Sequence, residues 1–131
     1  MYAEQALALY EQALKAPGSP AEKVKRLLKL PAGRLADADF YLSCPAGTVS
    51  LDLDSDLEGL RGAVQSFFDR MVELIAERLG MPDPHRARSF AGLLMTTIEG
   101  AYIRGRAERS TRAFDEAADW LSEIADARTR L

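Results

Sequence analysis

The segment from Ser89 to Ile103 most constrains the fold, because its sequence has helical character and almost no polar side. Glu99 is its only ionised residue, and Gly92, Thr96 and Gly100 form a stripe of small residues at four-residue spacing. A helix that is apolar all round must be covered all round. The remaining helices of a chain of 131 residues could barely do so. We therefore favour a second subunit as the cover, with a central helix buried inside the monomer as the alternative.

Helical periodicity extends over most of the chain, whereas no segment shows sustained strand alternation. The sequence therefore predicts an all-α fold, a bundle of about five main helices in a single domain that spans residues 1–131. The spacing of apolar residues places these helices over 3–16, from 19 to about 30, from 55 to 79, from 84 to about 104, and from 112 onward.

Residues that favour helix ends mark the boundaries. Capping residues at the expected starts are Ser19 with Glu22, Ser55 with Glu58, and Asp83 before Pro84. Pro31 and Gly33 break the pattern of the second helix, and Gly105–Thr111 has the composition of a polar connector. Between Pro31 and Asp54 the sequence predicts a connector with room for one short helix.

Charge and residue types exclude several classes of function. The formal net charge of −3 and the pI near 5.2 argue against an autonomous nucleic-acid binder, which usually carries a basic surplus. One histidine and one cysteine exclude a multi-histidine metal site and an internal disulfide framework. The N-terminus has no targeting pattern, and no apolar run is long enough to cross a membrane. We therefore expect a cytoplasmic protein without membrane contact.

The acidic stretch before the third main helix has the alternating spacing of a calcium-binding loop, in Asp52, Asp54 and Asp56. The calcium motif requires glycine at its sixth position and glutamate at its twelfth, where this chain has Leu57 and Ala63. The favourable electrostatics of a helix start explains the carboxylates instead. We therefore expect no metal site here.

Other residue types offer little catalytic chemistry. His85 has the position of a surface residue near a helix start, and Cys44 is interpreted as a buried structural cysteine without an activating base. We therefore expect neither an enzyme nor a cofactor. Two basic clusters are interpreted as solvated faces rather than nucleic-acid contacts: Lys23, Lys25, Arg26 and Lys29, and Arg104, Arg106, Arg109 and Arg112.

Three stretches carry a resemblance when they are taken together in order. They are Tyr41–Gly47 around Cys44, Val64–Met71, and Ile98–Arg106 with its glutamate-glycine-alanine sequence. In this order they resemble the C-terminal regulatory domain of TetR-family transcriptional repressors, most closely the subgroup with a central glycine-cysteine-proline motif. Ser43 stands where the subgroup has glycine. The resemblance covers about residues 3–127.

The resemblance implies a helical domain that dimerises through its last two helices as a four-helix bundle. It also implies a cavity among the earlier helices for a small apolar or aromatic effector. By position, the residues implied for the cavity wall are Tyr10, Cys44, Phe67, Phe68, Met71, Leu94 and Ile98. Those implied for the dimer seam are Leu93, Thr97, Gly100, Phe114, Leu121 and Ile124.

Family members begin with a three-helix DNA-binding domain, whereas this chain starts where the first regulatory helix would start. The resemblance therefore implies that DNA is bound only through a helix-turn-helix domain absent from these residues. The leading hypothesis is the effector-binding and dimerisation domain of a TetR-type regulator. One alternative is a stand-alone interaction protein that homodimerises or pairs with full-length relatives, and the other is a small helical enzyme.

Overall fold

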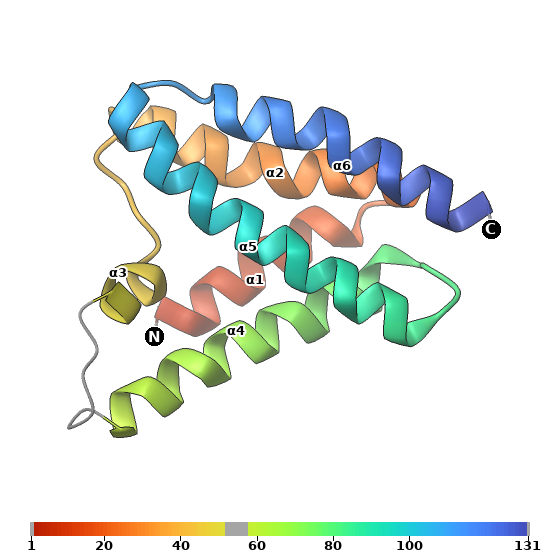
Figure 1. The fold of residues 1–131 in the computed structure, drawn as a ribbon, viewed down its shortest axis with the longest axis horizontal. Coiled ribbons are helices and arrows are strands. Elements are labelled where there is room, and N and C mark those ends of the chain that lie inside the picture. Colours follow the sequence, from red (N-terminus) through yellow and green to blue (C-terminus); the bar gives the residue numbers. More distant parts are fainter. Residues whose placement is uncertain (1, 52–57, 131) are drawn as a thin grey trace.

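The computed structural model describes residues 2–51 and 58–130, and these residues form helices joined by short connectors. No strand occurs in this part of the chain, so the predicted all-α fold is confirmed (Figure 1). Five main helices and one short helix follow each other in the order α1 (Tyr2–Lys15), α2 (Pro20–Asp37), α3 (Pro45–Leu51), α4 (Glu58–Leu79), α5 (Pro84–Glu108) and α6 (Arg112–Arg130).

The helices pack in pairs around one core. α2 and α6 lie side by side along the upper edge of Figure 1, and α5 crosses the middle of the view between them and α4. α1 packs against both α2 and α4, and α3 packs against α4. α3 packs mainly against α4, and a cavity lies between α3 and the C-terminal part of α5.

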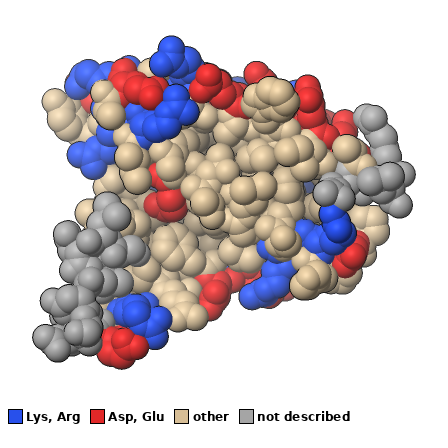
Figure 2. Space-filling model, in the orientation of Figure 1, with Lys and Arg blue, Asp and Glu red and all other residues tan. Residues whose placement is uncertain are grey.

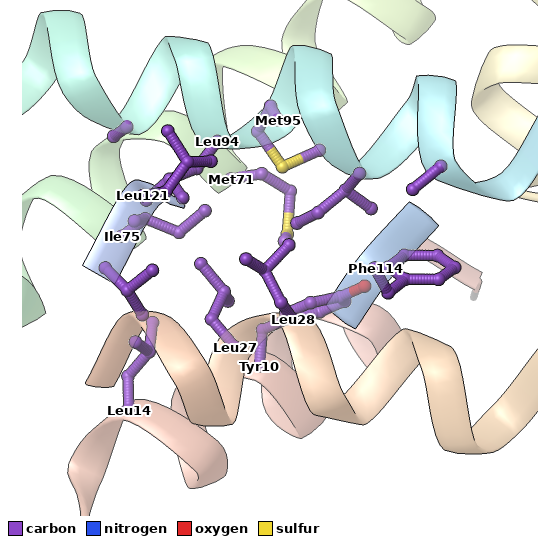
Figure 3. Packing of buried hydrophobic residues seen from close by; sticks show 14 of the residues in the cluster. Tyr10, Leu14, Leu27, Leu28, Met71, Ile75, Leu94, Met95, Phe114 and Leu121 are labelled. Atoms are coloured by element: carbon purple, nitrogen blue, oxygen red, sulfur yellow. The ribbon is translucent and has the colours of Figure 1, made fainter. Parts of the chain in front are cut away.

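The core consists of apolar side chains that converge from all five main helices (Figure 3). Leu14, Leu28, Met71 and Leu94 come from α1, α2, α4 and α5, and each has an exposed fraction of 0%. Full burial of one such side chain contributes about 1.5–3 kcal/mol to the free energy of unfolding. One apolar face of each main helix therefore packs into the core, as the amphipathic spacing of the sequence predicts.

Two of the predicted helix starts are confirmed in atomic detail. The Ser19 hydroxyl accepts a hydrogen bond from the backbone N–H of Glu22 at 3.2 Å. The Glu22 carboxylate accepts one from the Ser19 N–H at 3.1 Å, which completes the capping box. Asp83 Oδ1 accepts the His85 N–H at 3.0 Å at the start of α5. The third expected cap, Ser55, lies outside the described residues.

The predicted end of the second helix is wrong, because α2 runs through Pro31 and Gly33 to Asp37. Proline removes one backbone donor and crowds the preceding turn. The apolar spacing nevertheless continues past it, and Pro31, Ala32 and Leu35 are all buried. Packing of this face against the core offsets the lost hydrogen bond, and the exposed Gly33 does not interrupt the helix.

The polar connector expected at Gly105–Thr111 is also shorter than predicted. α5 continues to Glu108, and the turn begins only at Arg109, whose backbone adopts the left-handed conformation with φ 49°. Gly105 is buried inside the helix, where a β-carbon would lie 2.5 Å from Leu35 Cδ2 and 3.1 Å from the Ser110 carbonyl oxygen. Glycine therefore allows α5 and α2 to approach closely at this point, and is no helix end.

Ion pairs and hydrogen bonds join the outer faces of the helices. Arg70 and Arg78 of α4 reach Glu4 and Glu11 of α1 at 2.7 and 2.6 Å. Such exposed pairs contribute little to stability, about 0–1 kcal/mol each. Within the described part of the chain, no helix has the length and hydropathy needed to cross a membrane.

Candidate functional site

A cavity of about 740 Å³ lies between the α2–α3 connector, α3, α4 and the C-terminal part of α5. Its volume falls within the range of about 300–1,000 Å³ that is typical of small-molecule sites. Most of its wall is aromatic or aliphatic, and a few polar groups interrupt it. The residues that line the cavity include Phe40, Tyr41, Phe68, Tyr102, Glu99 and Arg106.

The contact between α3 and α5 positions the polar part of the wall. Gly47 of α3 faces the carboxylate of Glu99 so closely that a β-carbon at position 47 would collide with Glu99 Oε2. Only glycine leaves room for this approach. Cys44, which is buried just before α3, lies next to the same carboxyl group. The turn before α3 therefore fixes where Glu99 stands.

Glu99 is a partly buried carboxyl group in an apolar setting. Burial raises its pKa above the usual value of a glutamate, and a hydrogen bond with Cys44 acts in the opposite direction. Its Oε1 atom is buried, and among the described residues it has no hydrogen-bond partner. An unpaired buried polar atom is costly unless a ligand or another group satisfies it.

Tyr102 connects the cavity to the core. Burial raises the pKa of its hydroxyl, and a hydrogen bond with Tyr10 of α1 lowers it. The Tyr102 ring meets Phe114 of α6 edge to face, with 5.4 Å between the ring centroids and an interplanar angle of 86°. One residue of the cavity wall therefore touches both the first and the last helix of the chain.

Arg109 closes one side of the cavity mouth. Its guanidinium lies over the rings of Phe40 and Tyr41, at 5.8 and 5.7 Å from their centroids, and hydrogen-bonds Asp39 Oδ1 at 3.1 Å. Asp39 and Phe40 have positive φ angles of 52° and 62°, which non-glycine residues rarely adopt. The turn after α2 is thus held in an unusual shape that presents both aromatic rings to the cavity.

The structure divides the residues implied for the cavity wall into two groups. Cys44 and Phe68 line the cavity. The others lie in the core, to which Tyr10, Met71 and Leu94 contribute from α1, α4 and α5 (Figure 3). Phe67 and Ile98 are buried there as well.

Sequence reasoning misses most of the wall. Phe40, Tyr41, Glu99, Tyr102 and Arg106 line the cavity and are not among the residues that the resemblance implies for its wall. Glu99 could have been identified as a candidate site residue from the sequence, because it is the one ionised residue of the apolar segment 89–103. A charge in such a segment is more costly to bury than any neutral residue and therefore suggests a special environment. Tyr102 and Arg106 carry no comparable signal.

One face of α5 and α6 is apolar and uncovered. Figure 2 shows an uncharged area across the middle of the view, over α5, with charged side chains along its edges. Leu93 is 46% exposed, Ile103 60%, Trp120 70% and Ile124 40%. The chain therefore covers only one side of α5, so the alternative of a central helix buried inside the monomer is wrong.

The residues implied for the dimer seam also fall into two groups. Leu93, Gly100 and Ile124 are exposed on α5 and α6, and Thr97 lines a shallow groove beside Gly100 and Trp120. Phe114 and Leu121 instead have exposed fractions of 1% and 8% and pack inside this chain. These two residues stabilise the monomer and offer almost no surface to a partner.

The residues considered for catalysis do not meet. His85 is exposed and lines a cavity near the start of α5, whereas Cys44 lines the cavity beside α3. The structure describes no group of three or more potential metal ligands in residues 2–51 and 58–130. The aspartates considered for calcium, Asp52, Asp54 and Asp56, lie outside that part.

Several residues of the two basic clusters are used inside the chain. Lys23 donates to the Arg78 carbonyl at 2.7 Å, and Arg26 donates to the carbonyls of Pro17 and Ala16 at 3.0 and 2.6 Å. In the second cluster, Arg104 and Arg112 pair with Glu108, and Arg109 pairs with Asp39. These contacts fit the interpretation of both clusters as solvated faces.

Comparison with known proteins shows to which family the chain is similar. Residues 20–120 match the family described as transcriptional regulator LmrA/YxaF-like, C-terminal domain. The chain is 32% identical over 90 residues to an uncharacterized HTH-type transcriptional regulator of Mycobacterium tuberculosis, in strains CDC 1551 / Oshkosh and ATCC 25618 / H37Rv. This match covers 63% of the chain and 46% of the relatives, so the chain spans about half of their length.

No solved structure matches the chain. The family match extends from the start of α2 into α6 and includes all the elements around the cavity: the α2–α3 connector, α3, α4 and the C-terminal part of α5. The resemblance read from the three sequence stretches is confirmed by this match. The chain belongs to the LmrA/YxaF-like family of C-terminal domains of TetR-type transcriptional regulators.

Proposed function

We propose that this chain is the effector-binding and dimerisation domain of a TetR-type transcriptional regulator. The observation that carries the proposal is the cavity of about 740 Å³ beside α3, with an aromatic wall and a carboxyl oxygen that has no partner among the described residues. Ligand sites combine a largely apolar wall with a few polar groups that orient the ligand. The family supplies the regulatory context, and the cavity supplies the place for an effector.

The uncovered face of α5 and α6 supports the second half of the proposal. Leu93, Ile103, Trp120 and Ile124 expose more apolar surface than a helix pair normally leaves to water. A two-fold related copy of the chain would bury the same face on both partners. Gly100 has open space around its α-carbon, so a second helix could approach α5 closely at this position.

Effector binding would act through the relative positions of the helices. The cavity is lined by α3, α4 and α5, and its Tyr102 shares a hydrogen bond with Tyr10 of α1. A ligand shifts a conformational equilibrium only when it binds one state more tightly. An effector that contacts α3 and α5 together would favour one spacing of these helices, and a dimer would pass that preference to the DNA-binding heads of a full-length regulator.

Occupancy of the cavity can be tested with Nile red, a neutral apolar fluorophore. We expect the chain to bind one Nile red molecule with increased fluorescence. Thr48 is exposed at the cavity wall, so Thr48→Trp should fill part of the space and weaken binding at least about tenfold. The matched control is Ser66→Trp, which adds the same side chain to an exposed position of α4 that is not part of this cavity wall.

Equal weakening of Nile red binding by both tryptophan variants, or by neither, would contradict the cavity as the effector site. Far-UV circular dichroism of each variant checks that the helices remain formed. Absence of Nile red binding to the unaltered chain would equally count against the proposal.

An interaction protein is the second candidate, and the uncovered α5/α6 face is the observation that favours it. In this case the chain would pair with full-length relatives through this face and form heterodimers. Co-purification from the host distinguishes the two: recovery of self-dimers alone favours the effector-binding domain. Operator contact is assigned in both cases to a helix-turn-helix domain outside these residues.

A further inference from the structure

We infer that the cavity beside α3 selects a hydrophobic organic amine, whose cationic nitrogen pairs with the carboxylate of Glu99. The inference rests on the proposed function, in that it names the class of effector for the same cavity. Three observations carry it: the buried Oε1 atom that has no hydrogen-bond partner among the described residues, the way the fold holds the carboxyl group in place, and the aromatic rings around it.

The carboxyl group of Glu99 lacks the partner that its environment requires. Among the described residues, no lysine, arginine or histidine forms an ion pair with it, and its buried Oε1 accepts no hydrogen bond. A buried carboxylate is stable only when a cation or several donors compensate it. A ligand ammonium group supplies both the opposite charge and up to three donors.

The fold prevents Glu99 from relieving this cost by itself. Gly47 of α3 packs directly against the carboxyl group, so there is no space at this position for a side chain that could donate to it. Cys44 is the neighbouring hydrogen-bonding group, and a thiol is a weak donor. The position is therefore held open on the cavity side, where a ligand can reach it.

The rings of the wall favour the same class of ligand. Phe68 and Tyr102 line the cavity together with Glu99, and the faces of aromatic rings attract cations. They also provide the apolar surface that a hydrophobic amine buries. Arg109 shows this preference within the protein, since its guanidinium already lies over the rings of Phe40 and Tyr41.

The two arginines that line the cavity, Arg106 and Arg109, do not make it prefer an anionic ligand. Arg109 is paired with Asp39, so its charge is compensated. Arg106 is exposed, and water and salt screen an exposed charge much more strongly than one in the interior. Glu99 lies deeper, where its charge has the greater effect on a bound ligand. An anionic ligand would place its charge against this carboxylate.

Three naphthalene probes of similar size test the ligand class by titration calorimetry at neutral pH: 2-naphthylmethylamine, 2-naphthylmethanol and 2-naphthoic acid. We expect the unaltered chain to bind the amine about tenfold more tightly than the alcohol, and the acid most weakly. The amine should also displace Nile red, and Thr48→Trp should weaken its binding. Both results would place it in the cavity.

The variant Glu99→Gln keeps the shape of the side chain and removes its charge. We expect it to bind the amine and the alcohol within about twofold of each other, with alcohol affinity unchanged. The control is Glu108→Gln, which makes the same change on the same helix at a residue that pairs with Arg104 and Arg112 outside the cavity wall. It should preserve the tenfold preference.

Each outcome decides the inference. Equal or tighter binding of the alcohol or the acid by the unaltered chain overturns the amine, while the proposed effector site stands because the cavity is occupied. A preference for the amine that survives Glu99→Gln overturns the role of Glu99. Failure of all three probes and of Nile red counts against both proposals. If Glu99→Gln does not fold, the order of the three probes on the unaltered chain decides alone.

Discussion

Glu99 shows how a single residue can oppose the stability of the fold that holds it. Burial raises its pKa in the folded protein. The protonated form is therefore favoured by folding, and the contribution of Glu99 to stability is fully present below its pKa in the unfolded chain. That contribution is lost as the pH rises through the higher pKa of the folded state.

We predict that Glu99→Gln raises the melting temperature at pH 7.5 relative to the unaltered chain and has little effect near pH 4. Glutamine does not titrate, so it avoids the cost of an ionised, partly buried carboxylate at the higher pH. Thermal unfolding by circular dichroism at both pH values measures the difference. A shift of equal size at the two values would show that the effect comes from packing and not from ionisation.

The control for this prediction has the opposite sign. Hydrogen bonding to Arg104 lowers the pKa of the exposed Glu108. Its contribution is therefore present above its unfolded pKa and is lost as the pH falls through the lower pKa of the folded state. Glu108→Gln should lower the melting temperature slightly at pH 7.5 and leave it unchanged in acid.

Adjacent residues show what sequence reasoning could not decide at this scale. Phe67 and Phe68 are both aromatic, yet Phe67 is buried in the core and Phe68 lines the cavity. Leu93 is exposed, whereas Leu94 has an exposed fraction of 0%. Helical spacing indicates which side chains share a face, but it does not indicate which neighbouring helix covers that face.

At the scale of the helices, α2 and α5 meet closely at Gly105. The β-carbon of an alanine would lie 2.5 Å from Leu35 Cδ2, and Leu35 is buried with an exposed fraction of 0%. The same β-carbon would lie 3.1 Å from the backbone oxygen of Ser110, which cannot move without changing the turn. The two helices must therefore separate to accept it.

We predict that Gly105→Ala lowers the free energy of unfolding by about 1–3 kcal/mol, because overpacking forces neighbouring atoms apart. Gly33→Ala in α2 is the matched control, since a β-carbon there would meet no other described side chain within 4 Å. It should raise the free energy of unfolding by up to about 1 kcal/mol, as alanine is the better helix former. Urea denaturation of both variants measures these changes, and a stabilising Gly105→Ala would contradict the close approach.

The helix ends show a similar division between local and tertiary signals. The predicted caps at Ser19 and Asp83 are confirmed. Such caps can be predicted from the sequence because a cap depends on side chains within one turn. Pro31 and Gly105 are residue types that favour helix ends, yet both lie inside helices. Both are buried, and the packing that retains them comes from residues distant in the sequence.

At the scale of the whole molecule, the uncovered face of α5 and α6 determines the expected assembly. Leu93 and Leu60 have nearly equal exposed fractions, 46% and 45%, but only Leu93 lies on this face, while Leu60 lies on α4. They therefore form a matched pair for testing whether the face is an interface. Full burial of an exposed leucine side chain contributes about 1.5–3 kcal/mol, so burial of the exposed half of Leu93 would contribute about half as much in each copy.

We predict that the chain is a dimer at micromolar concentration and that Leu93→Glu converts it to a monomer. A carboxylate on each copy would be buried without a partner at the two-fold interface. Leu60→Glu should leave the dimer intact. Sedimentation equilibrium measures the mass of each protein, and a monomeric unaltered chain, or equal dissociation by both variants, would contradict the proposed interface.

The helical class, the helix starts at Ser19 and Asp83 and the family could be predicted from the sequence, because they depend on local periodicity, capping and ordered motifs. Which apolar residues fill the core, which line the cavity and which remain exposed became clear only from the packing of the helices. The reason is that burial depends on neighbours from other helices. Glu99 illustrates both cases. Its charge stands out in the apolar segment of the sequence, but its candidate role follows from its position against Gly47 in the cavity wall.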